Sequence, residues 1–166
     1  MLSKRQFLTG LSTVAVVAGA AAFMRGRPSF AAEGTFEITK TDEEWLRLLG
    51  RERFGVLRRQ GTEAPWTSEL LNEHRVGTFA CAGCDLPLYA SETKYDSGTG
   101  WPSFWQEIAG AVGTEEDRSY FMLRVELHCS RCGGHLGHRF DDGPQPTGLR
   151  HCINGLSLNF HPSPAA

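Results

Sequence analysis

Residues 128–143, HCSRCGGHLGHRFDDG, contain the second of two similar cysteine motifs in this 166-residue chain. The first motif is CAGC at residues 81–84 and the second is CSRC at residues 129–132. Two residues between the cysteines let both thiolates of a motif face one tetrahedral ion, so the two motifs together predict a structural zinc site. The predicted ligands are Cys81, Cys84, Cys129 and Cys132.

The turn after each motif supports the same prediction. The chain needs a positive φ just after the second cysteine, which Gly133 accepts readily and Asp85 less readily. The alternative is two disulfides, which an oxidising compartment permits, within or between the motifs. A disulfide inside a CxxC motif closes a very small loop and is usually labile or catalytic. We therefore expect one zinc ion per chain, with four thiolates leaving no open position for a substrate.

The sequence around the motifs predicts a mainly β fold. Nineteen Gly and eight Pro residues indicate many turns. Residues 76–90 indicate two short strands around the first cysteine turn, and residues 121–129 and 155–160 alternate apolar and polar side chains. We expect short antiparallel strands whose loops carry polar residues.

A helical region is predicted before the strands. Thr41 or Asp42 can cap a helix whose first turn is acidic, which suits the helix dipole. An apolar stripe follows, and Gly50 can end this piece. A second short helical stretch is expected over residues 52–59.

Composition limits the classes of function. The length suits one domain. Seventeen basic and nineteen acidic residues give a formal net charge of −2, with no long basic run. A general nucleic-acid binder usually shows a basic stripe, so we expect no nucleic-acid partner.

The first 31 residues have the order of an export signal. Lys4 and Arg5 precede an apolar stretch over residues 7–23, and small residues precede a plausible cleavage after Ala31. The signal resembles the twin-arginine type, which carries folded proteins, although Lys4 stands where the first arginine should be. The alternative is a retained N-terminal anchor. We expect export to the periplasm and a mature domain over residues 32–166, without a transmembrane segment.

The fifth cysteine, Cys152, has no partner in either motif. If residues 149–153 are extended, Arg150, Cys152 and Asn154 share one face. A guanidinium two residues away favours the reactive thiolate. The commoner fate of a lone cysteine is that of a buried small hydrophobe.

Histidines close to Cys152 in sequence favour chemistry over this inert alternative. If the chain folds back, His135 and His138 can meet Cys152 as acids, with Asp141 or Asp142 orienting one imidazole. Two histidines at this spacing are also compatible with an ordinary polar surface or a satisfied core pair.

The chain resembles the zinc-containing B type of methionine-R-sulfoxide reductase. Four stretches carry the resemblance: LRRQGTEAPWTSELLN, CAGCDLPLYASETKYDSGTGWPSFW, CSRCGGHLGHRFDDGPQPTGLRHCIN and SLNF. The resemblance implies two antiparallel sheets forming an open, tent-like barrel, with short helices at the N-terminal side. It also implies zinc on the four motif cysteines, away from the chemistry.

The same resemblance implies an activity and a set of site residues. The R epimer of methionine sulfoxide in proteins would be reduced to methionine, leaving a cysteine sulfenic acid that an external thiol, thioredoxin-like or small, regenerates. Cys152 matches the nucleophile, and Trp101 and Phe104 belong to the segment that packs on the substrate. The polar set of the site is His135, His138, Asp142, Arg150 and Asn154.

Four positions depart from the family pattern. Thr99 stands where many members have a resolving cysteine, and His151 stands where tyrosine is usual before the nucleophile. Arg139 replaces a small apolar residue, and Trp66 replaces phenylalanine. Two other classes compete with the reductase: a zinc-holding protein-binding module without catalysis, and a Cys-His hydrolase, which needs an oxyanion hole that the sequence does not identify.

Overall fold

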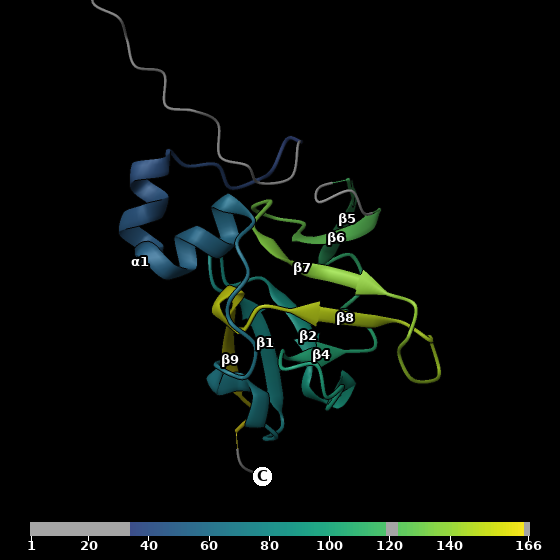
Figure 1. Cartoon of the computed structure of the whole chain (residues 1–166). Helices are drawn as coiled ribbons and strands as arrows, with labels where there is room; N and C mark the ends of the chain where they lie inside the picture. The colour runs from purple at the N-terminus through teal and green to yellow at the C-terminus, as the bar shows by residue number, and fades with distance from the viewer. Residues whose placement is uncertain (1–33, 119–122, 165–166) are drawn as a thin grey trace, which may run out of the picture.

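The computed structural model describes residues 34–118 and 123–164 (Figure 1). Within these residues, a kinked helix is followed by nine strands in two antiparallel sheets. This arrangement confirms the expected mainly β fold with two antiparallel sheets and a helical N-terminal side. The expected export signal, residues 1–31, lies outside the described residues.

Helix α1, Asp42–Arg59, lies beside the sheets (Figure 1). It begins with a capping box: the Thr41 hydroxyl accepts from the Glu44 backbone N–H, and the Glu44 carboxylate accepts from the Thr41 N–H at 2.8 Å. Gly50 has a φ of 72°, so the helix kinks where the sequence predicted a break, and its second part continues to Arg59. No helix among the described residues is long and apolar enough to cross a membrane.

The smaller sheet has the strand order β2-β1-β9. Its strands are β1 (Gly77–Cys81), β2 (Pro87–Ala90) and β9 (Leu158–Pro162). The expected alternation over residues 155–160 is only partly a strand, because the turn η4, Gly155–Ser157, precedes β9. The Glu63 carboxylate accepts hydrogen bonds from the backbone N–H groups of Gly155 and Leu156. These two donors therefore need no partner in a neighbouring strand.

The larger sheet has the order β3-β4-β8-β7-β6-β5, which places β8 between β4 and β7. The strand expected over residues 121–129 is β6 from Arg124 onward, and residues 119–122 lie outside the described part. Short 3₁₀ turns η1 (Glu69–Asn72) and η2 (Ser91–Thr93) lie in the connections. The strands are β3 (Lys94–Tyr95), β4 (Ser103–Phe104), β5 (Val112–Asp117), β6 (Arg124–Cys129), β7 (His135–Phe140) and β8 (Arg150–Ile153).

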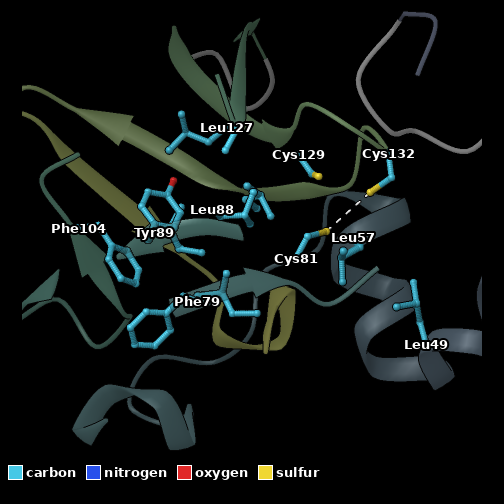
Figure 2. Close-up of a cluster of buried hydrophobic side chains, with 14 of the residues drawn as sticks. Leu49, Leu57, Phe79, Cys81, Leu88, Tyr89, Phe104, Leu127, Cys129 and Cys132 are labelled. Carbon is cyan, nitrogen blue, oxygen red and sulfur yellow. Dashed lines mark hydrogen bonds between the residues drawn. The ribbon is translucent and has the colours of Figure 1, made fainter. Parts of the chain in front are cut away.

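Both sheets and the helix contribute to one core (Figure 2). The Phe104 ring stacks on Tyr89 with centroids 4.3 Å apart and meets Phe79 edge-on at 5.0 Å. These rings are fully buried, as is Leu57 of α1. Burying one such side chain stabilises the fold by roughly 1.5–3 kcal/mol, so these contacts hold the two sheets together.

The four motif cysteines meet at the edge of this core (Figure 2). Their sulfur atoms all lie within 4.8 Å of one another, with Cys81 to Cys132 at 3.7 Å and Cys84 to Cys129 at 3.5 Å. A disulfide needs about 2.05 Å, whereas zinc bonds of about 2.3 Å place tetrahedral sulfur ligands about 3.8 Å apart. The donor set and its spacing therefore fit a structural zinc ion, as the motifs predicted.

The two cysteine turns share one backbone pattern, which explains why they converge. The residue after each motif donates to the carbonyl of the first cysteine at 2.8 Å, from Asp85 and from Gly133. Both residues have positive φ, 58° and 66°. Because the first turn follows β1 and the second precedes β7, the four-cysteine cluster joins the smaller sheet to the larger one.

Replacing Cys132 with Ser is expected to abolish zinc binding and unfold the domain. Structural zinc supplies folding free energy on the order of 10 kcal/mol, and the variant removes one of four ligands. Metal analysis of the purified wild-type protein should give about one zinc per chain. Cys152→Ser, which leaves the cluster intact, is the control and should retain both zinc and its circular dichroism spectrum. A folded, zinc-free wild type with the four cysteines in disulfides would contradict this account.

Candidate active site

Cys152 lies on the central strand β8, and the strands on either side supply its neighbours. The register places Ser103 of β4 opposite Cys152 on one side and His138 of β7 opposite it on the other. Residues directly opposite in antiparallel strands have Cβ atoms about 4.5–5.5 Å apart on the same face. The structure therefore brings Cys152 and His138 together, as the sequence predicted.

A cavity of about 160 Å³ lies at Cys152 and His138. Its wall includes the rings of Trp101 and Phe140. At Gly137 a side chain would collide with the Cys152 carbonyl oxygen, so glycine keeps the two strands in contact there. The lining residues are Thr62, Trp101, Arg124, Gly137, His138, Phe140, Cys152 and Asn154.

The Cys152 thiol is held largely in its protonated form. Burial raises its pKa above the ordinary 9.0, although the Arg150 guanidinium and a hydrogen bond from Thr99 act in the opposite direction. The sequence predicted the influence of Arg150 correctly in sign. It did not predict that desolvation outweighs this charge.

The Asp142 carboxylate binds the Arg150 guanidinium and does not contact a histidine ring. Its two carboxylate oxygens accept from Arg150 Nε at 2.8 Å and from a terminal Arg150 nitrogen at 2.9 Å. This bidentate pair lowers the pKa of Asp142 and fixes the guanidinium near Cys152. The expectation that Asp142 orients a histidine is therefore replaced by an indirect role, through Arg150.

His138 is oriented by a carboxylate from β5. Its Nε2 lies 2.8 Å from Asp117 Oδ2, and the same oxygen accepts from Arg124 at 2.5 Å. Burial lowers the pKa of His138 below the ordinary 6.5, while the hydrogen bond to Asp117 partly restores it. The imidazole is therefore neutral near pH 7, with Nε2–H donating to Asp117 and Nδ1 left to accept a proton.

His135 is a buried neighbour of His138, with ring centroids 5.4 Å apart. Its Nδ1 lies 2.6 Å from Glu126, which also accepts from Gln60 at 2.8 Å. Its Nε2 has no hydrogen-bond partner among the described residues. His135 borders a second hollow of about 410 Å³, which shares Thr62, Arg124 and His138 with the first cavity.

Trp101 and Asn154 are positioned by the loop that follows α1. The Trp101 indole N–H donates to the Glu63 carbonyl at 3.1 Å, and Asn154 Oδ1 accepts from the Glu63 N–H at 3.0 Å. The Asn154 amide also donates to the Leu136 carbonyl at 3.0 Å. Asn154 thus borders the cavity as a clamp between β7 and this loop.

Phe104, expected to contact substrate, does not border the cavity. It is fully buried in the core between Tyr89 and Phe79. Strand β4 has only two residues, and consecutive side chains point to opposite faces, so Ser103 faces Cys152 while Phe104 faces the core. The structure offers Phe140 as the second aromatic wall instead.

Sequence reasoning missed the partners of both histidines. Asp117 comes from β5, and Arg124 and Glu126 come from β6, the strand that ends at Cys129. The alternation over residues 121–129 put Arg124 and Glu126 on one polar face. That polar face was the only pattern in the sequence that could have indicated these partners. The strand register, which places Glu126 opposite His138, shows that the face lies against the two histidines.

Comparison with known proteins gives consistent matches. The SelR domain model matches residues 49–162. The peptide methionine sulfoxide reductase MsrB of Leifsonia xyli is 52% identical over 134 residues, covering 80% of this chain and 96% of that protein. The MsrB of Leptospira interrogans is 50% identical over 126 residues, covering 75% and 96%, and that of Methanosarcina barkeri is 52% identical over 124 residues, covering 74% and 87%. The chain therefore belongs to the SelR domain family, the family of the peptide methionine sulfoxide reductases MsrB.

Proposed function

We propose that this chain reduces the R epimer of methionine sulfoxide in proteins to methionine, with Cys152 as the nucleophile. The observation that carries the proposal is the small cavity that Cys152 and His138 share with two aromatic rings. A nucleophilic sulfur, a proton carrier and an apolar wall are the three parts that removal of oxygen from a sulfoxide requires. Membership of the SelR domain family supports the same activity.

The first step transfers oxygen from substrate sulfur to cysteine sulfur. The Cys152 sulfur attacks the sulfoxide sulfur while the sulfoxide oxygen receives a proton, since the oxygen leaves only when protonated. The attack forms a bond between the two sulfurs. The protonated oxygen then moves from the substrate sulfur to the Cys152 sulfur as the bond between the sulfurs breaks, which releases methionine and leaves Cys152 as a sulfenic acid. Two electrons pass from Cys152 to the substrate.

His138 is the proton carrier of this step. It borders the same cavity as Cys152, whereas His135 borders only the adjoining hollow. A neutral imidazole takes the thiol proton on Nδ1 and passes it to the sulfoxide oxygen, and Asp117 stabilises the transient imidazolium. His135, held by Glu126, packs beside His138 and supports its position.

The aromatic walls of the cavity select the methyl sulfoxide end of the substrate side chain. A cavity of about 160 Å³ suits the methyl group and sulfur of methionine sulfoxide rather than a larger side chain. The Trp101 ring is fixed by its hydrogen bond to Glu63, so it offers a rigid face to the methyl group. With the methyl group on the aromatic side and oxygen toward His138, only one epimer presents its sulfur to Cys152.

The sulfenic acid requires a thiol from another molecule. It normally condenses with a second thiol, but the remaining four cysteines belong to the four-cysteine cluster, and Thr99 has only a hydroxyl. The reductant is therefore a thioredoxin-like protein or a small thiol. The oxidised enzyme persists until that thiol arrives.

The protein is exported to the periplasm in a folded state. The support is the order of basic, apolar and small residues over residues 1–31. A tetrathiolate zinc site assembles most readily where thiols stay reduced, and folding first protects four of the five thiols. The mature domain then comprises residues 32–166, with cleavage after Ala31.

The activity is tested by a single turnover with each sulfoxide epimer of a methionine peptide, without reductant. The R epimer should yield one methionine per chain, and mass spectrometry should show one added oxygen on Cys152, trappable by dimedone. Cys152→Ser should form no methionine while retaining zinc. Substantial turnover by this variant, or a disulfide from Cys152 to a zinc-site cysteine, would refute the assignment. A binding module would leave both epimers unchanged, and a hydrolase would form no sulfenic acid.

The rate of the first turnover is expected to have a broad, bell-shaped dependence on pH. The active pair, Cys152 and His138, holds one proton between the lowered pKa of His138 and the raised pKa of Cys152. The rate should therefore be flat between these two pKa values, with the acid limb below pH 6.5 and the basic limb above pH 9.0. Below this range the imidazole is already protonated; above it the proton for the oxygen is gone.

Two variants examine the same profile. His138→Asn should slow the first turnover by roughly 10²–10⁴-fold, the usual contribution of a general acid. Asp117→Asn should move the acid limb to lower pH, because the Asp117 carboxylate raises the pKa of His138. A wild-type rate that only rises toward pH 9 would show that thiolate fraction alone controls the step.

Export is tested in a bacterial host by following processing of the full chain. The mature form should appear in the periplasm with zinc bound, and should be absent from that fraction in cells lacking the twin-arginine machinery. Replacing Lys4 and Arg5 together with Gln should also block processing. Unchanged export in the machinery-deficient cells would overturn the folded-export proposal without affecting the proposed activity.

A further inference from the structure

Trp66 has an exposed side chain and a left-handed backbone conformation. Its side chain is 64% exposed, and its φ is 68°, the left-handed region that bulky residues rarely adopt. A hydrogen bond from its N–H to the Gly100 carbonyl, 2.8 Å long, holds it there. A large apolar side chain kept in a strained conformation and left in water indicates a functional surface.

The strained turn at Trp66 is packed directly against the turn beside Cys152. Gly100 has a φ of 92°, and a Cβ there would lie 2.8 Å from Pro65 and 3.1 Å from Trp66. The turn that contains Gly100 also carries Thr99, whose hydroxyl hydrogen-bonds the Cys152 sulfur, and it leads into Trp101 on the cavity wall. Trp66 is therefore held against the turn that leads into the cavity residue Trp101.

The sheet order separates the two sides of Cys152. His138 comes from β7 on one side, which we call the histidine flank. On the other side, Ser103 of β4 hydrogen-bonds Ser97 at 2.7 Å, and Ser97 hydrogen-bonds Thr99 at 2.8 Å. This hydroxyl chain, Ser103–Ser97–Thr99, forms the threonine flank, where Trp66 also lies.

The threonine flank lies on the side of Cys152 opposite the strand that carries His138. The oxygen reaches Cys152 beside the proton carrier, on the histidine flank. A thiolate displaces oxygen from sulfur in line, entering opposite the bond that breaks. The entering sulfur therefore approaches from the side of the threonine flank, next to the Gly100 turn that holds Trp66.

We propose that Trp66 is the contact on which a thioredoxin-like dithiol protein docks to reduce oxidised Cys152, an inference that rests on the proposed function. One thiolate of the partner attacks the Cys152 sulfur, forming a sulfur–sulfur bond as the oxygen leaves with protons as water. The second thiol of the partner then attacks this mixed disulfide. Cys152 returns as a thiol, and the partner keeps both oxidising equivalents as its own disulfide.

A protein partner fits this surface better than the substrate peptide or a small thiol. Tryptophan is enriched among the residues that dominate binding energy at protein interfaces. The methyl group of the substrate already has Trp101 and Phe140, and its oxygen belongs to the histidine flank. A small thiol reaches Cys152 without needing an exposed indole.

The experiment compares three measurements for Trp66→Ala, Trp66→Phe and the control Val76→Ala, whose side chain is also 64% exposed but lies next to the smaller sheet. The measurements are the first-turnover rate with an R-sulfoxide peptide, steady-state turnover with dithiothreitol, and kcat/KM for a recombinant thioredoxin. Trp66→Ala should lower only the last, by about tenfold, and Trp66→Phe should restore most of it. The control should change none of the three.

Each contrary result has a distinct meaning. A slower first turnover in Trp66→Ala would place Trp66 against the substrate and overturn the proposal, as would an equal loss with dithiothreitol or no loss with thioredoxin. Failure of the wild type to form methionine would defeat the proposed function instead. If Trp66→Ala does not fold, the wild type is trapped in a mixed disulfide with a thioredoxin lacking its second cysteine. Backbone amides of residues 65–67 should then exchange hydrogen more slowly than in the free enzyme, and unchanged exchange would overturn the proposal.

Discussion

The convergence of four cysteine sulfurs is the constraint on which the rest of the structure depends. The cluster joins the end of β1 to the turn between β6 and β7, so it ties the smaller sheet to the larger one. Helix α1 is fastened at the same place, because Arg58 donates to the Cys132 carbonyl at 2.9 Å and Leu57 is fully buried beside the second cysteine turn. With these elements fixed, β7 and β8 pair in a single register that sets His138 against Cys152.

The same arrangement divides the sulfur chemistry of the chain. Four thiols form the four-cysteine cluster, and the fifth, that of Cys152, lies in a separate cavity where burial raises its pKa. Burial also lowers the pKa of His138, so the Cys152 thiol and the His138 imidazole are both neutral at rest. In the proposed mechanism, the thiol proton passes through His138 to the sulfoxide oxygen. In the proposed mechanism, Arg150, held by Asp142, and the Thr99 hydroxyl stabilise the charge that Cys152 develops as it attacks.

Features set by neighbouring residues were predictable from the sequence, whereas features set by strand register were not. The cysteine turns, the break at Gly50 and the extended strand around Cys152 each follow from a few adjacent residues, and the structure confirms them. The partners of the histidines come from β5 and β6, and no local pattern aligns those strands with β7. Phe104 and Asp142 were expected at the site from the family resemblance. The pleat of a two-residue strand turns Phe104 into the core, and Asp142 pairs with Arg150 through both carboxylate oxygens.

X-ray absorption at the zinc edge, recorded before and after one turnover with an R-sulfoxide peptide, tests the separation of structural and reactive sulfur most directly. The account predicts four sulfur ligands at about 2.3 Å in both states, with one added oxygen found on Cys152 alone. Loss of a sulfur ligand after turnover, or release of zinc, would show that a cluster cysteine takes part in the chemistry. That result would contradict the division of labour on which the proposed mechanism stands.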